Sequence, residues 1–509
     1  MTTFSDLAIN DLKVKWFENR GYSGSLSDMV LKYYNDLCGG SFLSSGDALE
    51  RTLLNAGYTG SKHDMYYRML LESINGSASD YSLTDAERKF YSDTNNQFGI
   101  LTKTLADYTG LTFYKSHRYA SSVNANYSIG SGTGTFTASR GASNPATYVD
   151  AFGVVWLVTT SNTPRFTQGF YDTTGFVSRP GLMMERASTN LLQDSYFADG
   201  STTYWEVITG GTVAADTTYS NPYGAGQIEK IVGTAINQGM VTSTAKKVAD
   251  VQGTKYTVSA LVRGTGSVKL YWSDAITQVS GEFILDPNEW TRVQFTFLAA
   301  ATTTSLVGVI NFANAALTCY VANIQCEANP YATSFIPTTT AALTRNQEKL
   351  TYLTSGNRTA ATESVFIKFT VESAFTSDAN YRLLTDTVNV GRYFSRETGT
   401  SVIKVFPNIT NNGAVFINTT TSPAAGTSYV LGATMNSAGT PGLTVYIDGV
   451  SEGTTDAGFT APAWGTYFSC GHYATGDHNL DGIIQSVAFF SDAKSAGDVL
   501  AISNILAAG

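Results

Sequence analysis

The stretch Tyr256-Thr-Val-Ser-Ala-Leu-Val262 decides the fold class, because apolar and polar side chains alternate along it with the period of two that marks a strand. Many short strands with one apolar face predict antiparallel sheets stacked as sandwiches. The same alternation recurs in Val268-Lys-Leu-Tyr-Trp272, in Arg292-Val-Gln-Phe-Thr-Phe297, in Val365-Phe-Ile-Lys-Phe-Thr-Val371, and in Leu443-Thr-Val-Tyr-Ile447, which ends at the hairpin turn Asp448-Gly449.

Length and composition agree with this assignment. A chain of 509 residues contains about three or four folded units at typical domain sizes. Hydrophobic residues make up 43% and charged residues 14%, which excludes a disordered chain or a coiled coil. The chain has 47 glycines but only 11 prolines, and 29 tyrosines and 27 phenylalanines, which is typical of short strands joined by tight turns.

Charge and cysteine usage exclude several function classes. A net charge of −9 argues against a nucleic-acid partner, because phosphate binding needs a basic surface. The four cysteines are too scattered for a disulfide framework or a zinc site. The N-terminus has no signal-peptide pattern. The uncharged stretch between Arg292 and Glu327 is interrupted by polar residues, so it predicts two buried strands and no membrane insertion.

The N-terminal part differs from the rest, since residues 1–120 hold 26 of the 73 charged residues. It contains a repeat in which glycines suit helix ends, and Ser25 and Ser61 suit the caps of the next helices. We predict helical hairpins over residues 1–80 and a helical linker over 81–110. The hairpins either only pack together or dock the chain onto a larger assembly, since two repeats are too few for a freestanding solenoid. The repeated residues are Gly21, Tyr22, Gly24, Asp28 and Met29, then Gly57, Tyr58, Gly60, Asp64 and Met65.

Near residue 110 the spacing of the apolar residues changes from the helical period to a period of two, and this change marks where the β-rich part of the chain begins. We predict a β-rich connecting region over 111–190, one sandwich over 191–345 and a second over 346–509. The fold class is therefore mainly β, with two antiparallel sandwiches and a small α-helical N-terminal domain.

Several motifs resemble tailed-bacteriophage virion proteins, especially tail fibres, spikes and head fibres. The first runs through Phe136-Thr-Ala-Ser-Arg140, Ala146-Thr-Tyr-Val-Asp-Ala-Phe-Gly-Val154, Pro164-Arg-Phe166 and Gly181-Leu-Met-Met-Glu-Arg-Ala-Ser-Thr-Asn-Leu-Leu192. The second, Ile324-Gln-Cys-Glu327 to Leu343-Thr-Arg345, resembles the segment that closes a carbohydrate-binding-module-like jelly roll in such proteins. Residues 443–502 resemble a concanavalin or laminin-G-like sandwich. The N-terminal repeats are also similar to repeats in phage structural proteins.

The resemblance implies a non-enzymatic virion structural protein. Its N-terminus would attach to capsid or tail proteins, and its lectin-like domains would bind a host cell-surface glycan. It also implies a homotrimer that is made in the host cytoplasm and released within the virion by lysis. Two alternatives stay open: a tailspike that depolymerises glycan, and a capsid decoration protein without a receptor role. The sequence lacks the short regular repeat of the parallel β-helix that would favour the depolymerase.

We interpret the charged residues of the motifs as linker features. Adjacent Glu185 and Arg186 would form an exposed pair that contributes about 0–1 kcal/mol. Where related jelly rolls often carry an aspartate, this chain has Ala322, so no structural calcium ion is expected at that point.

No catalytic constellation is recognisable. The four histidines lack metal-binding spacing, and no phosphate-binding glycine pattern or nucleophile elbow occurs. A glycosidase needs two carboxylates about 5–9.5 Å apart across a cleft. The densest acidic segment, Asp274, Glu282, Asp286 and Glu289, is interpreted as solvated turns.

Two kinds of binding site are predicted. Exposed aromatic rings at loop ends would form stacking platforms for sugars, although such residues are more often part of a core; the candidates are Trp205, Trp464, Tyr467 and Tyr473. Asp477, Asn479 and Asp481 alternate as ligands of a structural calcium ion would, although an Asx turn explains them as well. No other cofactor is expected.

Overall fold

The structure is a computed structural model, and it describes most of the chain after residue 104. The described residues are 105, 108–116, 128–129, 136–140, 145–150, 152–158, 160, 162–198, 203–224, 226–274, 276–359, 361–372, 381–386, 393–396, 401–407, 415–461, 465–472 and 480–508. The N-terminal repeats lie outside these ranges. Gly110–Ser503 form one compact unit.

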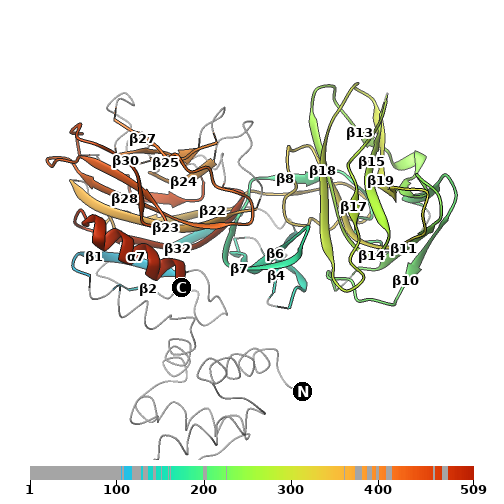
Figure 1. The fold of residues 1–509 in the computed structure, drawn as a ribbon, viewed down its shortest axis with the longest axis horizontal. Helices are drawn as coiled ribbons and strands as arrows, with labels where there is room; N and C mark the ends of the chain where they lie inside the picture. Colours follow the sequence, from blue (N-terminus) through green and yellow to red (C-terminus); the bar gives the residue numbers. More distant parts are fainter. Residues whose placement is uncertain are drawn as a thin grey trace, which may run out of the picture. The chain divides into compact units, whose positions relative to one another are not determined.

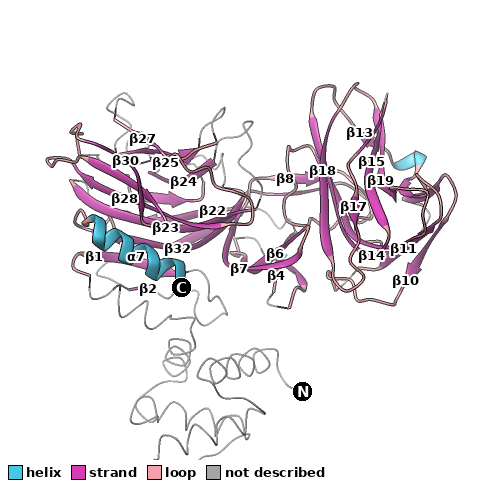
Figure 2. Cartoon of the chain, viewed as in Figure 1, coloured by secondary structure: helices cyan, strands magenta, loops and turns pink. Residues whose placement is uncertain are grey.

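The described chain is mainly β, and its sheets are antiparallel, as the sequence predicts (Figure 2). Val365–Val371 lie in β23, Tyr256–Val262 lie in β14, and Leu443–Ile447 form β29. Asp448 and Gly449 both have positive φ angles, which is the conformation of the predicted hairpin turn. The uncharged stretch forms strands, and none of the described helices is long and apolar enough to cross a membrane.

The inserted sandwich, residues 191–345, packs a five-stranded sheet against a seven-stranded sheet. The five-stranded sheet has the order β10 (Thr212–Asp216), β11 (Ile228–Gly233), β20 (Leu317–Glu327), β14 (Lys255–Thr265) and β18 (Thr291–Leu298). The other has the order β16 (Thr277–Val279), β15 (Ser267–Ser273), β19 (Thr304–Asn311), β12 (Gly239–Thr242) and β9 (Trp205–Ile208); β13 (Val248–Ala249) pairs with β19, and β17 (Phe283–Ile284) with β15. A 3₁₀ turn, η2, spans Thr244–Lys246.

The core of the inserted sandwich is organised around Trp272, which is fully buried between the two sheets. Its indole stacks on the rings of Tyr256 and Phe297, which are neighbours on β14 and β18, at centroid distances of 4.9 and 6.0 Å. Both faces of β14 are buried, although its sequence alternates. The polar face is covered by the segment after β20, whose carbonyl at Asn329 accepts a hydrogen bond from the Thr257 hydroxyl.

The C-terminal sandwich packs two larger sheets. The first has the order β30 (Val450–Thr455), β29, β28 (Ser428–Asn436), β23 (Thr362–Val371), β32 (Gly482–Phe490), β7 (Gly175–Met184), β6 (Phe166–Asp172), β4 (Ala146–Val149) and β5 (Val155–Val158), with β1 (Leu111–Ser116) on β32 and β2 (Ser128–Ile129) on β1. The second has the order β27 (Ile417–Asn418), β26 (Lys404–Phe406), β25 (Tyr393–Arg396), β24 (Tyr381–Asp386), β31 (Tyr467–Cys470), β22 (Lys349–Leu353) and β3 (Phe136–Ser139).

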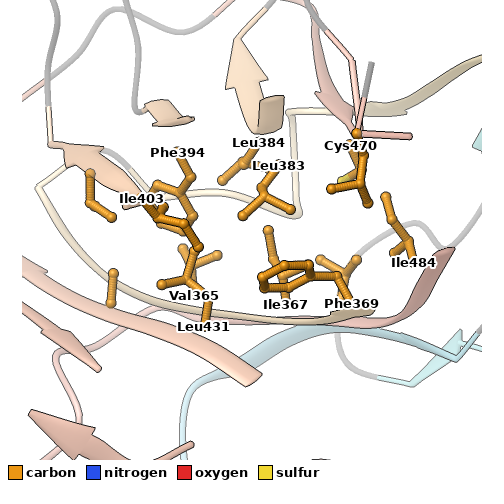
Figure 3. Close-up of a cluster of buried hydrophobic side chains, with 14 of the residues drawn as sticks. Val365, Ile367, Phe369, Leu383, Leu384, Phe394, Ile403, Leu431, Cys470 and Ile484 are labelled. Atoms are coloured by element: carbon orange, nitrogen blue, oxygen red, sulfur yellow. The ribbon is translucent and has the colours of Figure 1, made fainter. Parts of the chain in front are cut away.

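Apolar residues of both sheets meet in the core of the C-terminal sandwich. Figure 3 shows Val365, Ile367 and Phe369 of β23 facing Leu383 and Leu384 of β24. The helix α7 (Ala496–Ala508) follows the last strand. Its start is fixed by a capping box, in which the N–H of Ser495 donates to the carboxylate of Asp498 and the N–H of Asp498 donates to the hydroxyl oxygen of Ser495.

The structure corrects the interpretation of residues 111–190 as a separate connecting region. Strand β1 pairs with β32 (Leu111 opposite Phe490), and β7 also pairs with β32 (Figure 1). Strand β3 pairs with β22. These early strands therefore complete the sheets of the C-terminal sandwich, and the inserted sandwich interrupts that domain. Where the chain enters and leaves the inserted sandwich, β8 (Ser188–Asn190) pairs with β21 (Leu343–Arg345).

Candidate functional site

The hairpin β4–β5 holds an exposed tryptophan in a fixed orientation. Asp150 ends β4, and its Oδ1 accepts hydrogen bonds from the backbone N–H groups of Phe152 (2.8 Å) and Val154 (2.9 Å). Its Oδ2 accepts a hydrogen bond from the indole Nε1 of Trp156, at 2.6 Å. Gly153 completes the turn with a φ of 78°, which glycine adopts at little cost. The carboxylate of Asp150 thus fixes both the conformation of the turn and the orientation of the Trp156 indole.

The hairpin presents its aromatic side chains to solvent. Trp156 is 46% exposed and Phe152 is 47% exposed. Tyr148 lies directly opposite Trp156 across the two strands, so both side chains are on one face of the hairpin. Burial, and next the charge of Asp150, raise the pKa of Tyr148, so its hydroxyl stays protonated at neutral pH.

The hairpin is anchored on the inserted sandwich. The N–H of Val155 donates to the carbonyl of Pro222 at 2.7 Å, and Val155 packs with Tyr223 and Phe335 in a small buried cluster. The hydroxyl of Tyr171 donates to the carbonyl of Gly153 at 2.7 Å. Burial, together with the charges of Asp150 and Glu289, raises the pKa of Tyr171 to about 12, so this donor keeps its proton.

Tyr171 also connects the hairpin to the outer face of the five-stranded sheet, where it packs on the same cluster as Tyr219. The guanidinium of Arg263 lies 3.9 Å from the centre of the Tyr219 ring. We call Phe152, Trp156, Tyr171, Tyr219 and Arg263 the aromatic surface. Tyr171 thus links the hairpin with its exposed rings to a cluster that carries a charged hydrogen-bond donor, and these are the two elements of a sugar-binding surface.

A second cationic side chain, Lys230, packs on an aromatic ring beside the aromatic surface. The ring of Tyr320 meets Tyr219 edge-on at 4.7 Å, and the ammonium of Lys230 lies 5.4 Å from the centre of the Tyr320 ring. Lys230 also approaches the carboxylate of Asp216, at 3.7 Å.

The motif residues converge at a second place, a buried cluster that we call the ionic junction: Arg165, Glu185, Arg345 and Glu348. Arg165 donates to Glu185 at 2.6 Å and to Glu348 at 2.7 Å, and Arg345 lies 3.0 Å from Glu185. The expectation of an exposed Glu185–Arg186 pair was therefore wrong. Glu185 is fully buried and pairs with arginines that are distant in sequence.

Glu185 serves the ionic junction as a structural charge and not as a general acid. Burial alone would raise the pKa of Glu185, but Arg345 and Arg165 outweigh it and lower the pKa to about 2. Ser334 adds two hydrogen bonds to the same carboxylate, at 2.6 Å each. Glu185 is consequently ionised at neutral pH and has no proton to donate to a leaving group.

Arg186 instead pairs with Asp481, one of the predicted calcium ligands. Asp481 accepts hydrogen bonds from the backbone N–H and Nε of Arg186, at 2.9 and 2.7 Å, and from the hydroxyl of Tyr331, at 2.6 Å. The carboxylate of Asp481 thus serves an ion pair. Asp477 and Asn479 lie outside the described residues, so the calcium site stays a prediction. In the part of the chain that the structure describes, no three His, Cys, Asp or Glu side chains are grouped to hold a metal ion.

The predicted aromatic residues have different positions. Trp205 is corrected: it is only 4% exposed, packs on Phe197, and donates its indole N–H to the carbonyl of Asp194, so it belongs to the core. Tyr467 is 44% exposed on β31, as a stacking residue requires. Trp464 and Tyr473 lie outside the described residues. In the acidic segment, Asp274 and Asp286 accept backbone N–H bonds two residues ahead, as turn residues do.

The sequence reasoning missed Trp156 and the ionic junction. Trp156 lies two residues after the Ala146–Val154 motif, but it belongs to the apolar run Val154–Val158, where alternation gives no exposed face. The junction had a usable signal, because charged residues are rare after residue 120 and several of them fall inside the motifs.

Comparisons with known proteins found no matching family model and no matching curated protein. Three solved structures overlap with about a third of the chain or less. The CBM22-1 xylan-binding domain of Xyn10C from Paenibacillus barcinonensis has a TM-score of 0.23 at 14% identity, covering 30% of this chain and 99% of that domain. The CBM40 of Ruminococcus gnavus IT-sialidase with α2,3-sialyllactose has a TM-score of 0.24 at 11% identity, covering 28% and 83%. Domain 4 of the Geobacillus stearothermophilus arabinanase AbnA with arabinotriose has a TM-score of 0.25 at 14% identity, covering 31% and 73%.

Proposed function

We propose that the protein is a bacteriophage virion fibre or spike protein that binds a host cell-surface glycan, without cleaving it, through its aromatic surface. The observation that carries the binding proposal is Trp156, a half-exposed indole whose orientation is fixed by Asp150. An immobilised ring loses little conformational entropy on binding, so its contact energy is retained in the complex.

The chemistry of the aromatic surface suits a sugar. One face of a pyranose carries C–H groups that stack on an indole or phenyl ring, while its hydroxyl groups need hydrogen-bond partners. Trp156 and Phe152 supply ring faces, and Arg263 supplies guanidinium donors. At the ionic junction, Arg165 pairs with Glu185 and Glu348, and Arg345 pairs with Glu185, so these charges hold one another and not a ligand.

The virion role rests on the motifs around residues 136–192 and 324–345 and on the N-terminal repeats. In this proposal the repeats attach a homotrimer to capsid or tail proteins, on either the head or the tail, and the particle is released by host lysis. Immunogold labelling of virions with an antibody against the protein tests this part, and absence of label from purified particles would refute it.

A glycan array with the full-length chain, followed by calorimetric titration of the best oligosaccharide, tests the binding. We expect Trp156→Ala to weaken binding at least tenfold, because its indole provides the main stacking area. Phe416→Ala is the matched control, since Phe416 is an exposed aromatic residue of the C-terminal sandwich. Equal glycan affinity of Trp156→Ala and wild type would refute the aromatic surface as the binding site. If only Tyr467→Ala loses glycan binding, the binding site lies at β31 instead.

Incubation of host polysaccharide with the protein separates binding from depolymerisation. We expect the polysaccharide to keep its chain length on size-exclusion chromatography. A shorter product would replace the binding proposal with the depolymerase.

A further inference from the structure

Glu229 is a largely buried acid of the inserted sandwich, and no ion pair reaches it in the described part of the chain. It lies on β11 directly opposite Val321 of β20 and shares the inner face of the sheet with Ile231, because side chains alternate along a strand. It is 7% exposed, and in the described part of the chain no hydrogen bond or ion pair reaches its carboxylate. A buried unpaired charge is costly unless it is protonated or compensated.

A second buried acid lies close to Glu229. Asp194 is 2% exposed, and its Oδ1 caps the following turn by accepting the N–H of Ala198 at 2.6 Å. Burial, and next the charge of Asp194, raise the pKa of Glu229 to about 7. Two carboxylates that repel each other at one end of the sandwich would both be ionised if a cation lay between them.

Asn323 is the third group, and it is the independent observation at this place. It is 5% exposed and has a φ of 51°, at a point where β20 bulges against β14. Both its Oδ1 and its Nδ2 lack a hydrogen-bond partner. The bulge sets both Asn323 and Ile324 opposite Ala260, a residue of the inner core, and Asn323 lies two residues beyond Val321, the partner of Glu229. The next residue, Ile324, donates its N–H to the carbonyl of Ser195, which ties the bulge to the residue after Asp194.

We propose that Glu229, Asp194 and Asn323 bind a hard divalent cation, for which Ca²⁺ is the probe. Carboxylate and amide oxygens are calcium ligands, and backbone carbonyls and water complete such shells. A dication would compensate both carboxylates and give the amide oxygen of Asn323 a partner. This site differs from the position of Ala322, whose side chain packs with Leu261 and Tyr320, and from the predicted site at Asp477, Asn479 and Asp481. It is independent of glycan binding.

Thermal unfolding of the full-length chain in EDTA and in CaCl₂ tests this proposal. At 100 times its dissociation constant, Ca²⁺ should raise the melting temperature of the inserted sandwich by about 5–10 °C. Glu229→Gln should abolish this shift, whereas Glu282→Gln, a change at an exposed acid, should keep it. Isothermal titration should give one site in the wild type and none in Glu229→Gln.

Asn323→Asp makes the test sharper, because a third carboxylate should change the stability of the protein in opposite directions in EDTA and in CaCl₂. We expect this variant to be less stable than the wild type in EDTA and to bind Ca²⁺ more tightly. The proposal is overturned if Ca²⁺ does not shift the wild type while Glu229→Gln is more stable, since Glu229 would then be only a buried protonated acid. It is also overturned if Glu229→Gln retains the full calcium shift.

Discussion

Replacing Arg165 with methionine should destabilise the protein strongly, because this guanidinium connects most of the ionic junction. Its side chain is fully buried and makes four hydrogen bonds: to Glu348 at 2.7 Å, to Glu185 at 2.6 Å, and to the Thr147 carbonyl and the Ser334 hydroxyl at 2.7 Å each. Methionine fills part of the volume but leaves Glu348 and Glu185 short of positive charge.

The expected magnitude follows from this uncompensated charge. Removing one partner of a buried ion pair costs about 3–5 kcal/mol. Glu185 keeps Arg345 at 3.0 Å, but the Glu348 oxygen that accepted Arg165 loses its guanidinium. For a cooperative unit of 150–250 residues, this loss corresponds to a decrease in melting temperature of about 6–20 °C.

Calorimetry and circular dichroism of the full-length chain would measure the effect. Lys247→Met is the matched control, because Lys247 is an exposed cation on the inserted sandwich, and a surface change of this kind costs at most about 0.5 kcal/mol. Adding Glu348→Gln to Arg165→Met should restore part of the stability, since it removes the unpaired charge. If Arg165→Met behaves like Lys247→Met, the junction does not stabilise the fold and the reasoning fails.

Three further predictions follow from individual groups. The pKa of Glu185 is lowered from 4.5 to about 2, so the stabilisation by its charge is complete above pH 4.5 and is lost as the pH falls towards 2. Glu185→Gln should therefore reduce the fall of the unfolding free energy, measured with urea, between these two pH values. An unchanged pH dependence in the variant would contradict this. Trp272→Ala should cost about 3–5 kcal/mol by calorimetry, since the indole is stacked and fully buried, and a loss below 1 kcal/mol would count against the core assignment. Asp150→Ala frees the Trp156 indole and removes two hydrogen bonds of the turn, so glycan affinity should fall severalfold in titrations and the melting temperature should fall as well, whereas unchanged affinity would show that the indole needs no positioning.

The sequence predicts the strands well because their signal is local. Alternation placed Val365–Val371 and Leu443–Ile447 in strands, and the Asp448–Gly449 turn needs only its own two residues. The pairing of Leu111 with Phe490 has no such signal. Strand partners so far apart are chosen by the packing of the whole core, and for that reason the sequence alone predicts a separate region over residues 111–190.

The candidate site was less accessible to sequence reasoning. Trp205 and Trp156 are both aromatic residues at or near strand starts, but Trp205 faces the core while Trp156 lies on the outside of a hairpin. Only the three-dimensional position of the hairpin on Tyr223 separates the two cases. The charges of Arg165 and Glu185 were visible in the motifs, yet their pairing depends on β6 lying beside β7.

Fluorine NMR of the full-length chain labelled with 5-fluorotryptophan tests the central claim most directly, because it detects each indole separately while the glycan is present. The spectrum of Trp156→Phe assigns the resonance of Trp156. The account predicts that an oligosaccharide of the host surface shifts this resonance in a saturable way and leaves buried Trp272 unchanged. A glycan that binds without moving the Trp156 resonance would contradict the account.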